Sequence, residues 1–292
     1  MGSISKIWIK AKRNDEKSLK VALRLVDLLE KKGFKVYLDP RIVKQTEKYA
    51  DRVLDEKSVS NKNIDLITVV GGDGTLLRLF HDLSNGMPLL LCINVDSIGF
   101  LYDYDYHDID RVIDMLVKGG FSVKRRKVGE VFLSKKGKKE KLYFLNEVAV
   151  FNRDFFNILK FKVYLEDELL YKGRADAIVV ATTTGASAYA LSSNGPVIDP
   201  DLECFVITPV APFSALLKPV VVSPRKKIRI VPEDNAIAII DGYIKIFIKS
   251  GSEVKISASD RYLSFITGEC RKTFSEKLTN RLLDKPWSFK LG

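Results

Sequence analysis

Residues 64–83 read IDLITVVGGDGTLLRLFHDL, and the order of features along this run sets the expectation for the first half of the chain. Ile64–Val70 is nearly all apolar and β-branched, which is typical of a strand buried on both faces of a parallel sheet. The turn Gly71–Thr75 follows, and apolar residues at helical spacing then run from Leu76 to Leu83. Because ligands of open α/β sheets bind at the carboxyl ends of strands, the glycine turn is a candidate ligand site.

Strand and helix patterns alternate on both sides of this run. Apolar strands are expected at residues 5–10, 34–38 and 88–93, and helices at residues 15–32, 41–58 and 106–118. This repeated order predicts an α/β fold, with a doubly wound parallel sheet over residues 1–120.

The pattern changes after Gly119-Gly120, where short strands follow one another. They include residues 142–151, 253–258 and 261–266, and turn signals such as Asp241-Gly242 separate them. We therefore expect a second, strand-rich domain over residues 121–269. The polar tail, residues 270–292, is expected to pack back on the first domain.

The positive charge of the chain is concentrated in one segment. The chain has 48 Lys and Arg against 37 Asp and Glu, a formal net charge of +11; residues 124–141 hold nine basic and two acidic side chains, which is +7 of that total. The segment predicts a hairpin, whose tip lysines (Lys135, Lys136, Lys138 and Lys139) either are simply solvated or attract polyphosphate. No pattern of a nucleic-acid-binding module accompanies the charge, so nucleic acid is not an expected partner.

Cysteine content and hydropathy bear on the compartment. Cys92, Cys204 and Cys270 are odd in number and widely spaced, which argues against a disulfide framework or a zinc site and predicts a reducing cytoplasm. No apolar run approaches the roughly 18 residues of a membrane span, and the first residues lack a signal-peptide pattern. A membrane partner is therefore not expected.

An aspartate stands inside the glycine turn. Backbone N–H groups around Gly72, Gly74 and Thr75 can approach phosphate oxygens closely, and the following helix adds a partial positive charge at its N-terminus. A carboxylate beside a phosphate is unfavourable unless a metal or a proton transfer needs it. Asp73 is therefore a candidate for deprotonating or orienting a hydroxyl nucleophile in phosphoryl transfer. The alternative is that Asp73 only caps the following helix.

Two polar segments in the second half carry further candidates. Asn146 offers hydrogen-bond donors and an acceptor, and Glu147 offers acceptors; such a pair can bind vicinal hydroxyls or an amide, or can be merely a polar strand end. Residues 171–199 run from a strand into a hydroxyl-rich glycine turn and then a short helix at residues 186–192. Hydroxyl and N–H groups at that turn can bind adenine edges or phosphate, or only cap the helix.

With these residues in view, the chain resembles the NAD kinase family. The Gly71–Thr75 turn is shared by that family with diacylglycerol and sphingosine kinases and with relatives of 6-phosphofructokinase, so it does not choose among them. The Asn146-Glu147 pair and the turn from Thr184 to Tyr189 match the NAD kinase pattern, and the motifs stand in order from residue 64 to 266.

The resemblance implies a kinase that phosphorylates the 2′-hydroxyl of the adenosine ribose of NAD to make NADP, with ATP, another nucleoside triphosphate or polyphosphate as donor. It implies that Asp73 is the base and that Mg²⁺ arrives on the donor phosphates, with no metal ligand among the side chains. It also implies a homodimer or homotetramer in which a neighbouring subunit completes the site. The residues that it places at the nucleotide sites are Gly72, Gly74, Thr75, Arg78, Phe100, Asn146, Glu147, Arg174, Asp176, Thr184, Ser187, Ala188, Tyr189, Ser192, Ala211, Asp241 and Tyr243.

Several residues depart from the family's pattern. Cys92 and Asp96 stand where glycines are usual, and Phe213, Lys218 and Tyr243 replace a His, an Arg and a Gln. The replaced His and Arg motivate one alternative, a non-catalytic NADP-binding sensor. Another kinase of the superfamily, acting on a lipid or a sugar, is the second. The preference between NAD and NADH, the donor and the oligomer size stay open.

Overall fold

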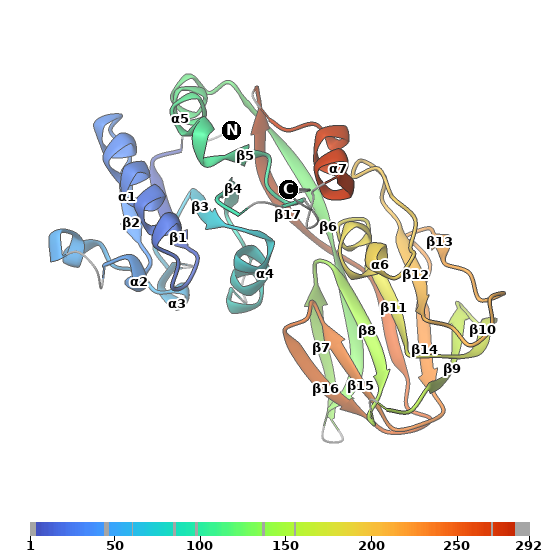
Figure 1. Cartoon of the computed structure of the whole chain (residues 1–292). Coiled ribbons are helices and arrows are strands. Elements are labelled where there is room, and N and C mark those ends of the chain that lie inside the picture. Colours follow the sequence, from blue (N-terminus) through green and yellow to red (C-terminus); the bar gives the residue numbers. More distant parts are fainter. Residues whose placement is uncertain are drawn as a thin grey trace, which may run out of the picture. The chain divides into compact units, whose positions relative to one another are not determined.

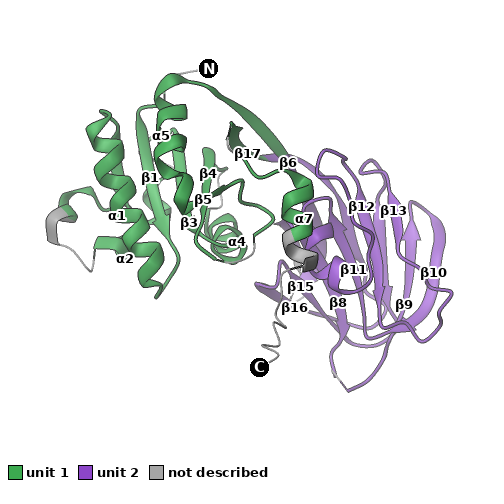
Figure 2. Ribbon diagram, turned by 45° about the horizontal axis from the view of Figure 1, so that its top comes forward, with its two compact units in different colours: residues 1–125, 263–292 green, residues 126–262 purple. Residues whose placement is uncertain are grey.

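A computed structural model of the 292-residue chain describes residues 4–43, 47–59, 61–83, 86–96, 99–135, 138–154, 156–269 and 271–283 (Figure 1). The chain forms two compact units, drawn in different colours in Figure 2. Unit 1 comprises residues 1–125 and 263–292, and unit 2 comprises residues 126–262. The chain passes from one unit to the other within two long strands, β6 (Phe121–Lys135) and β17 (Val254–Gly268).

Unit 1 is built on a parallel sheet. Its strands are β1 (Lys6–Ala11), β2 (Lys35–Leu38), β3 (Leu66–Gly71), β4 (Leu89–Asn94) and β5 (Tyr104–Asp105). The order is β17-β4-β3-β1-β2, with β5 also beside β4. In the register, Ala11 lies opposite Val70 and Gly71 lies opposite Asn94. The carboxyl ends of β1, β3 and β4 therefore meet at one edge of the sheet.

The helices of unit 1 follow the strand–helix order of the sequence. They are α1 (Glu16–Lys31), α2 (Pro40–Val43), α3 (Glu56–Val59), α4 (Asp73–Asp82), α5 (Ile109–Lys118) and α7 (Phe274–Leu283), with 3₁₀ turns η1 (Glu47–Arg52) and η2 (Tyr106–Asp108). Asp15 caps α1 by accepting the N–H of Ser18 at 2.7 Å, and Gly119 ends α5 at φ 67°.

Apolar faces of these helices cover the sheet. Buried residues of α1 and α5 pack with inward residues of β1, β3 and β4 in one core, and Figure 1 shows the two helices side by side. Helix α4 instead contacts β3 directly after the glycine turn. The predicted parallel α/β fold is confirmed.

The single helix predicted over residues 41–58 is wrong. The described part of that segment forms α2, η1 and α3, separated by non-helical residues. Val53 pairs with Leu38 at the edge of the sheet, and the carbonyl of Leu54 accepts the indole N–H of Trp8 at 3.0 Å. These contacts hold the backbone extended between the short helices.

Unit 2 consists of two antiparallel sheets around an apolar core. One sheet has the order β13-β12-β11-β8-β15-β16, and in the other β10-β9-β14-β17 is extended by β6 and β7. The strands are β7 (Lys138–Phe144), β8 (Glu147–Asn152), β9 (Leu159–Leu165), β10 (Glu168–Ala175), β11 (Ala177–Thr182), β12 (Phe205–Val210), β13 (Val220–Val222), β14 (Ile228–Pro232), β15 (Ala236–Ile240) and β16 (Ile244–Ile248). Alternate residues of both sheets, such as Val150 and Phe161, share one core. The prediction of a strand-rich second half is confirmed.

Several strand boundaries differ from the prediction. Residues 142–144 and 147–151 belong to two strands, β7 and β8, which lie in different sheets, and residues 254–266 belong to the single strand β17. Strand β10 escaped prediction because a register shift between Leu169 and Tyr171 breaks its alternation. The predicted hairpin is formed by β6 and β7, but Lys136 at its tip lies outside the described residues.

The turn after β11 covers the outer face of its sheet. It forms a 3₁₀ turn η3 (Gly185–Ser187) followed by α6 (Tyr189–Ser192). Ala186 and Ala190 pack on Val179 and Val206 of the sheet. This packing, which includes Ala149 of β8, fixes the hydroxyl-bearing turn against the sheet in which Glu147 begins β8.

Candidate functional site

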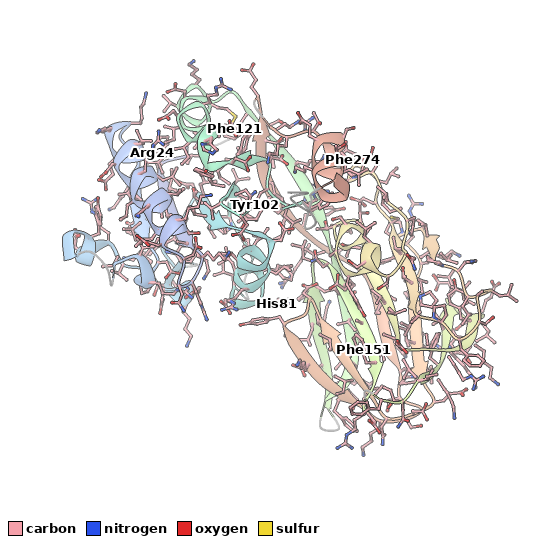
Figure 3. All side chains as sticks on the ribbon, in the orientation of Figure 1. Arg24, His81, Tyr102, Phe121, Phe151 and Phe274 are labelled. Atoms are coloured by element: carbon pink, nitrogen blue, oxygen red, sulfur yellow. The ribbon has the colours of Figure 1, made fainter. Side chains whose placement is uncertain are left out.

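The glycine turn is held at three points. The N–H of Thr75 donates to the carbonyl of Gly72 at 2.8 Å, and the N–H of Val95 donates to the carbonyl of Gly71 at 3.1 Å. The hydroxyl of Tyr102, a residue labelled in Figure 3, also donates to Gly72 at 2.8 Å, and burial raises the pKa of that hydroxyl well above its usual value. A Cβ on Gly71 would lie 2.5 Å from the Thr75 hydroxyl, so the turn closes too tightly there for any side chain.

Asp73 is the first residue of α4, and its carboxylate is oriented by another loop. Oδ2 accepts the N–H of Phe100 at 3.1 Å, and Oδ1 accepts the N–H of Leu101 at 3.2 Å. The N-cap position of the helix belongs to Gly72, so Asp73 does not occupy the capping position of the alternative interpretation. A carboxylate held in this way is a hydrogen-bond acceptor of fixed orientation.

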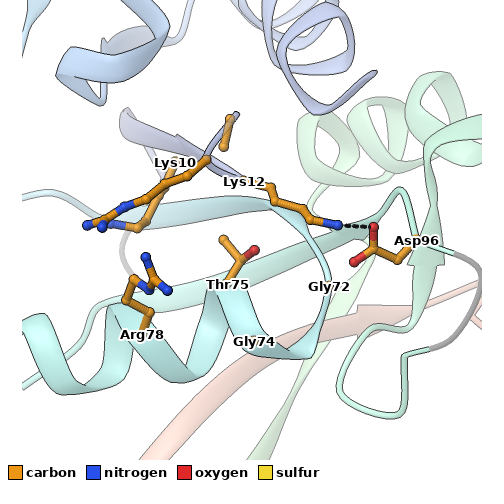
Figure 4. A pocket seen from close by; sticks show the side chains of 9 residues that line it. Lys10, Lys12, Gly72, Gly74, Thr75, Arg78 and Asp96 are labelled. Atoms are coloured by element: carbon orange, nitrogen blue, oxygen red, sulfur yellow. Dashed lines mark hydrogen bonds and ion pairs between the residues drawn. The ribbon is translucent and has the colours of Figure 1, made fainter. Parts of the chain in front are cut away.

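A pocket of about 270 Å³ opens beside this turn (Figure 4). Its lining contains four basic residues and one acidic residue: Lys10, Lys12, Arg13, Arg78 and Asp96. Gly72, Gly74 and Thr75 complete it with Ala11. Basic side chains beside backbone N–H groups at a helix N-terminus suit a phosphate chain.

Arg78 and the turn are among the residues predicted from the sequence, whereas the three basic residues of β1 and its following loop are not. Their signal was available, because Lys10, Lys12 and Arg13 lie at the carboxyl end of a predicted parallel strand. Predicting their place in the pocket would also have required the register that sets β1 next to β3.

Lys10 is almost fully buried, with 2% of its side chain exposed, and it belongs to an ion network. Its ammonium lies 2.5 Å from Glu56 and 3.6 Å from Asp39, and Arg41 pairs with both carboxylates. Burial opposes ionisation of Glu56, but the hydrogen bond and charge of Lys10 outweigh it and, with Arg41, lower the pKa of Glu56 to about 2. The network thus holds the Lys10 side chain in the wall of the pocket.

In unit 2, Asp241 orders the Asn146-Glu147 pair. Its carboxylate accepts the N–H groups of Leu145 and Asn146 at 2.8 Å and of Glu147 at 3.0 Å, and its backbone is left-handed at φ 49°. One carboxylate accepts three backbone hydrogen bonds between the end of β7 and the start of β8, which is why the predicted single strand breaks here. The Asp241 carboxylate therefore positions Asn146 and Glu147 by binding their backbone N–H groups.

The hydroxyl-rich turn contacts the same pair. The N–H of Thr182 donates to the carbonyl of Asn146 at 2.8 Å, and the Thr182 hydroxyl donates to Leu145 at 2.5 Å. A Cβ on Gly185 would lie 2.0 Å from the Asn146 carbonyl oxygen. Residues 182–187 and Asn146-Glu147 are therefore brought together, as a combined site requires.

The surroundings of Glu147 raise the pKa of its carboxyl group. It is 8% exposed, and its Oε2 has no hydrogen-bond partner among the described residues. Burial, and then the nearby charge of Asp241, raises the pKa of Glu147 to about 8. At neutral pH its carboxyl is therefore protonated and can donate a hydrogen bond to a ligand.

The remaining candidates in unit 2 fall into two groups. Thr184 is buried and its carbonyl accepts the Ser187 hydroxyl at 3.1 Å, while the Tyr189 ring stacks on Phe151 at 6.2 Å. Ala188, between them, is partly exposed. The other candidates lie at exposed positions: Arg174, Asp176, Ser192, Ala211 and Tyr243.

Arg174 lines a different pocket from the one beside the glycine turn. Its guanidinium lies 4.2 Å from the centre of the Phe213 ring, and it lines a separate pocket of about 600 Å³ with Asn152, Lys160 and Asp234. Ala211, nearby in sequence to Phe213, has a left-handed backbone at φ 44°.

The described part of the chain was searched for sets of metal ligands and for membrane-spanning helices. There, no three His, Cys, Asp or Glu side chains gather into a set that could hold a metal ion. No helix there is both long and apolar enough to cross a membrane.

Comparison with known proteins places the chain in a family. Residues 7–121 match the family model of the ATP-NAD kinase N-terminal domain, and residues 145–268 match that of the C-terminal domain. The NAD kinase of Thermococcus gammatolerans is 32% identical over 261 residues, which cover 88% of this chain and 92% of that protein. The chain belongs to the NAD kinase family. Bifunctional NADP phosphatase/NAD kinases are also similar; that of Methanocaldococcus jannaschii is 30% identical over 95% of this chain, and the chain spans 47% of that protein, about half its length.

Two solved kinase structures share the fold. An NAD kinase from Archaeoglobus fulgidus in complex with ATP is 26% identical, with a TM-score of 0.73 over 90% of this chain and 94% of that chain. Yeast NADH kinase complexed with NADH is 20% identical, with a TM-score of 0.85 over 100% of this chain and 91% of that chain. The second likeness is one of fold alone.

Proposed function

We propose that the chain is an NAD kinase, which transfers the terminal phosphoryl group of ATP to the 2′-hydroxyl of the adenosine ribose of NAD. One observation carries the proposal: Asp73 is oriented by two backbone N–H groups beside a pocket lined by four basic side chains. The relatives named NAD kinase and the family member solved with ATP support both the acceptor and the donor.

The basic pocket of unit 1 would receive the donor phosphates. Its volume of about 270 Å³ lies just below the roughly 300–1,000 Å³ of small-molecule sites, so it suits a phosphate chain better than a whole dinucleotide. Gly72, Gly74 and Thr75 would bind phosphate oxygens through N–H groups, and Arg78 through its guanidinium. Bound Mg²⁺ would neutralise charge that develops on the transferred group. The donor set fits such an ion, since Mg²⁺ takes one or two carboxylates beside phosphates and Asp96 offers one.

Asp73 would serve as general base. As the 2′-oxygen forms its bond to the terminal phosphorus, the bond from that phosphorus to the bridging oxygen breaks and ADP leaves. The proton of the 2′-hydroxyl passes to Asp73, whose position is already fixed by Phe100 and Leu101.

The cluster in unit 2 would bind NAD. Asn146 and protonated Glu147 would hydrogen-bond polar groups of the dinucleotide, with Thr184, Ser187 and Tyr189 beside them. Burial of Asn146 and Glu147 makes such bonds selective, since a ligand without matching groups would leave them unpaired.

We also propose a homodimer or homotetramer in a reducing cytoplasm. Phe247 of β16 and Tyr243 before it are 43% and 46% exposed in unit 2, and they would be covered in an oligomer. Light scattering across a dilution series measures the oligomer size directly.

Steady-state NADP formation with purified protein tests the function. ATP and polyphosphate are compared as donors, and NAD, NADH, a sphingoid base, diacylglycerol and fructose 6-phosphate as acceptors. NADP formed from NAD and ATP supports the proposal. Product from another acceptor alone, or binding of NADP by calorimetry without any turnover, contradicts it.

A further inference from the structure

Among the residues that the structure describes, Asp96 is the one acidic residue that lines the basic pocket. Its Oδ1 lies 2.6 Å from the ammonium of Lys12, the ion pair marked by a dashed line in Figure 4. A Cβ on Gly72 would lie 2.2 Å from Oδ2, so the second oxygen rests against the backbone of the phosphate turn. The side chains of Lys12 and Asp96 are 38% and 34% exposed, which leaves both within reach of a ligand.

The position of Asp96 does not depend on Lys12. The Asn94 side chain binds its backbone twice: Nδ2 donates to the Asp96 carbonyl at 2.8 Å, and Oδ1 accepts the Asp96 N–H at 3.2 Å. Lys12 is held separately, through its N–H bond to Val70 at 2.8 Å. The backbone that carries the Asp96 carboxylate would therefore stay beside the pocket if Lys12 turned to another partner.

A carboxylate here has opposite effects on two forms of the same donor. It repels a metal-free triphosphate, because two anionic groups would share a confined site. With a divalent cation between carboxylate and phosphate oxygens the interaction becomes favourable, and a carboxylate beside phosphates is a usual magnesium environment. Lys12, which pairs with Asp96 in this structure, attracts a phosphate oxygen more strongly when Asp96 has another cation.

We propose that Asp96 makes binding of the phosphate donor depend on a divalent cation. Without donor it pairs with Lys12; with a magnesium-bound triphosphate it exchanges Lys12 for the metal and leaves the ammonium to the phosphates. This inference rests on the proposed function, and it adds a selectivity for the metal-bound form of the donor.

Isothermal titration calorimetry with ATP, in the absence of NAD, tests the inference. Titrations are run in EDTA and in excess Mg²⁺. We expect the wild-type protein to bind ATP at least about tenfold more tightly with Mg²⁺, and we expect Asp96→Asn to bind metal-free ATP about tenfold more tightly than wild type. The ratio of the two affinities should therefore fall several-fold in the variant. An unchanged ratio overturns the proposal.

Asp110→Asn is the matched control. Asp110 lies on α5, pairs with Arg24 at 2.6 Å and is 60% exposed, so this change removes the same charge from unit 1 away from the pocket. Its affinity ratio should equal that of wild type. Circular dichroism melting checks that Asp96→Asn folds, as expected since its backbone bonds to Asn94 are retained.

Lys12→Met gives an independent reading if Asp96→Asn is poorly folded. Because Asp96 occupies Lys12 until the metal arrives, the variant should weaken ATP binding in Mg²⁺ more than in EDTA. Equal weakening in both conditions overturns the exchange. Failure of the wild-type protein to bind ATP in either condition contradicts the proposed function itself, which separates that failure from failure of the Asp96 inference.

Discussion

The ammonium of Lys277, on the last described helix α7, donates to the carbonyl of Phe100 at 3.1 Å and also pairs with the carboxylate of Asp103. The loop that it holds supplies the two N–H groups that orient Asp73. Lys277 is 8% exposed, so this contact is shielded from water. A residue near the end of the chain is thus connected, through one loop, to the proposed base.

Lys277→Met should lower kcat about ten- to a hundredfold with little change in the Kd for ATP, because the loop that fixes Asp73 loses its anchor. Lys277→Arg should recover part of the loss. Lys272→Met is the control, since Lys272 pairs with Asp105 on the same segment at a more exposed site. Equal losses in the two Met variants would assign Lys277 a merely structural role.

Asp73→Asn should lower kcat about 10²- to 10⁴-fold while the affinities for ATP and NAD stay near wild type, because the amide keeps the shape and one of the two N–H bonds but cannot accept the proton. Asp82→Asn, at the other end of α4, should leave turnover unchanged. Initial rates and calorimetric titrations measure both. Near wild-type turnover of Asp73→Asn would show that Asp73 is not the base.

The raised pKa of Glu147 makes stability depend on pH. Because its folded pKa of about 8 lies above its ordinary value of 4.5, the folded state holds the proton more tightly than the unfolded state. This contribution is complete below about pH 4.5 and is lost as the pH rises to about 8.

Glu147→Gln should therefore flatten the decline in melting temperature between pH 5 and 8, because its neutral amide has no proton to lose. The comparison variant is Glu233→Gln, whose carboxylate is about one-third exposed beside Lys162. Differential scanning calorimetry at several pH values measures the slopes. A Glu147→Gln slope as steep as that of wild type would contradict the assigned pKa.

Gly185→Ala should destabilise unit 2 by about 1–3 kcal/mol and weaken NAD binding, because the added methyl would overlap the Asn146 carbonyl. Gly120→Ala makes the same change where no atom lies within 4 Å of the new Cβ. Urea unfolding and NAD titration should separate the two variants; similar behaviour would mean that the turn yields without displacing Asn146.

Local patterns predicted the parts of this fold that depend on neighbours in sequence. The buried strand before Gly71 and the helix after Asp73 follow from apolar spacing alone. The break between β7 and β8 could not be predicted, because it is made by the carboxylate of Asp241, far along the chain.

The site was predicted in part, because some of its residues lie in local motifs and others meet only through contacts between distant segments. Asp73, Asn146 and Glu147 were predicted from motifs. Their proposed roles are supported by hydrogen bonds that orient the Asp73 carboxylate and hold the backbone of Asn146 and Glu147. Lys12 and Asp96 are brought together by the register of β1, β3 and β4. Neither residue belongs to the glycine turn, so the motif that predicts the pocket does not predict their ion pair.

Unit 2 interrupts unit 1, and this arrangement has a consequence for synthesis on the ribosome. Residues 126–262 emerge complete before residues 263–268, whose Phe265 pairs with Leu90 and whose Ile266 enters the core of unit 1. Unit 2 can therefore fold co-translationally, whereas unit 1 must keep part of the β4 edge open until the last strand arrives. The unit that contains Asp73 is thus the later one to mature, and its closure depends on contacts of high sequence separation, which form slowly.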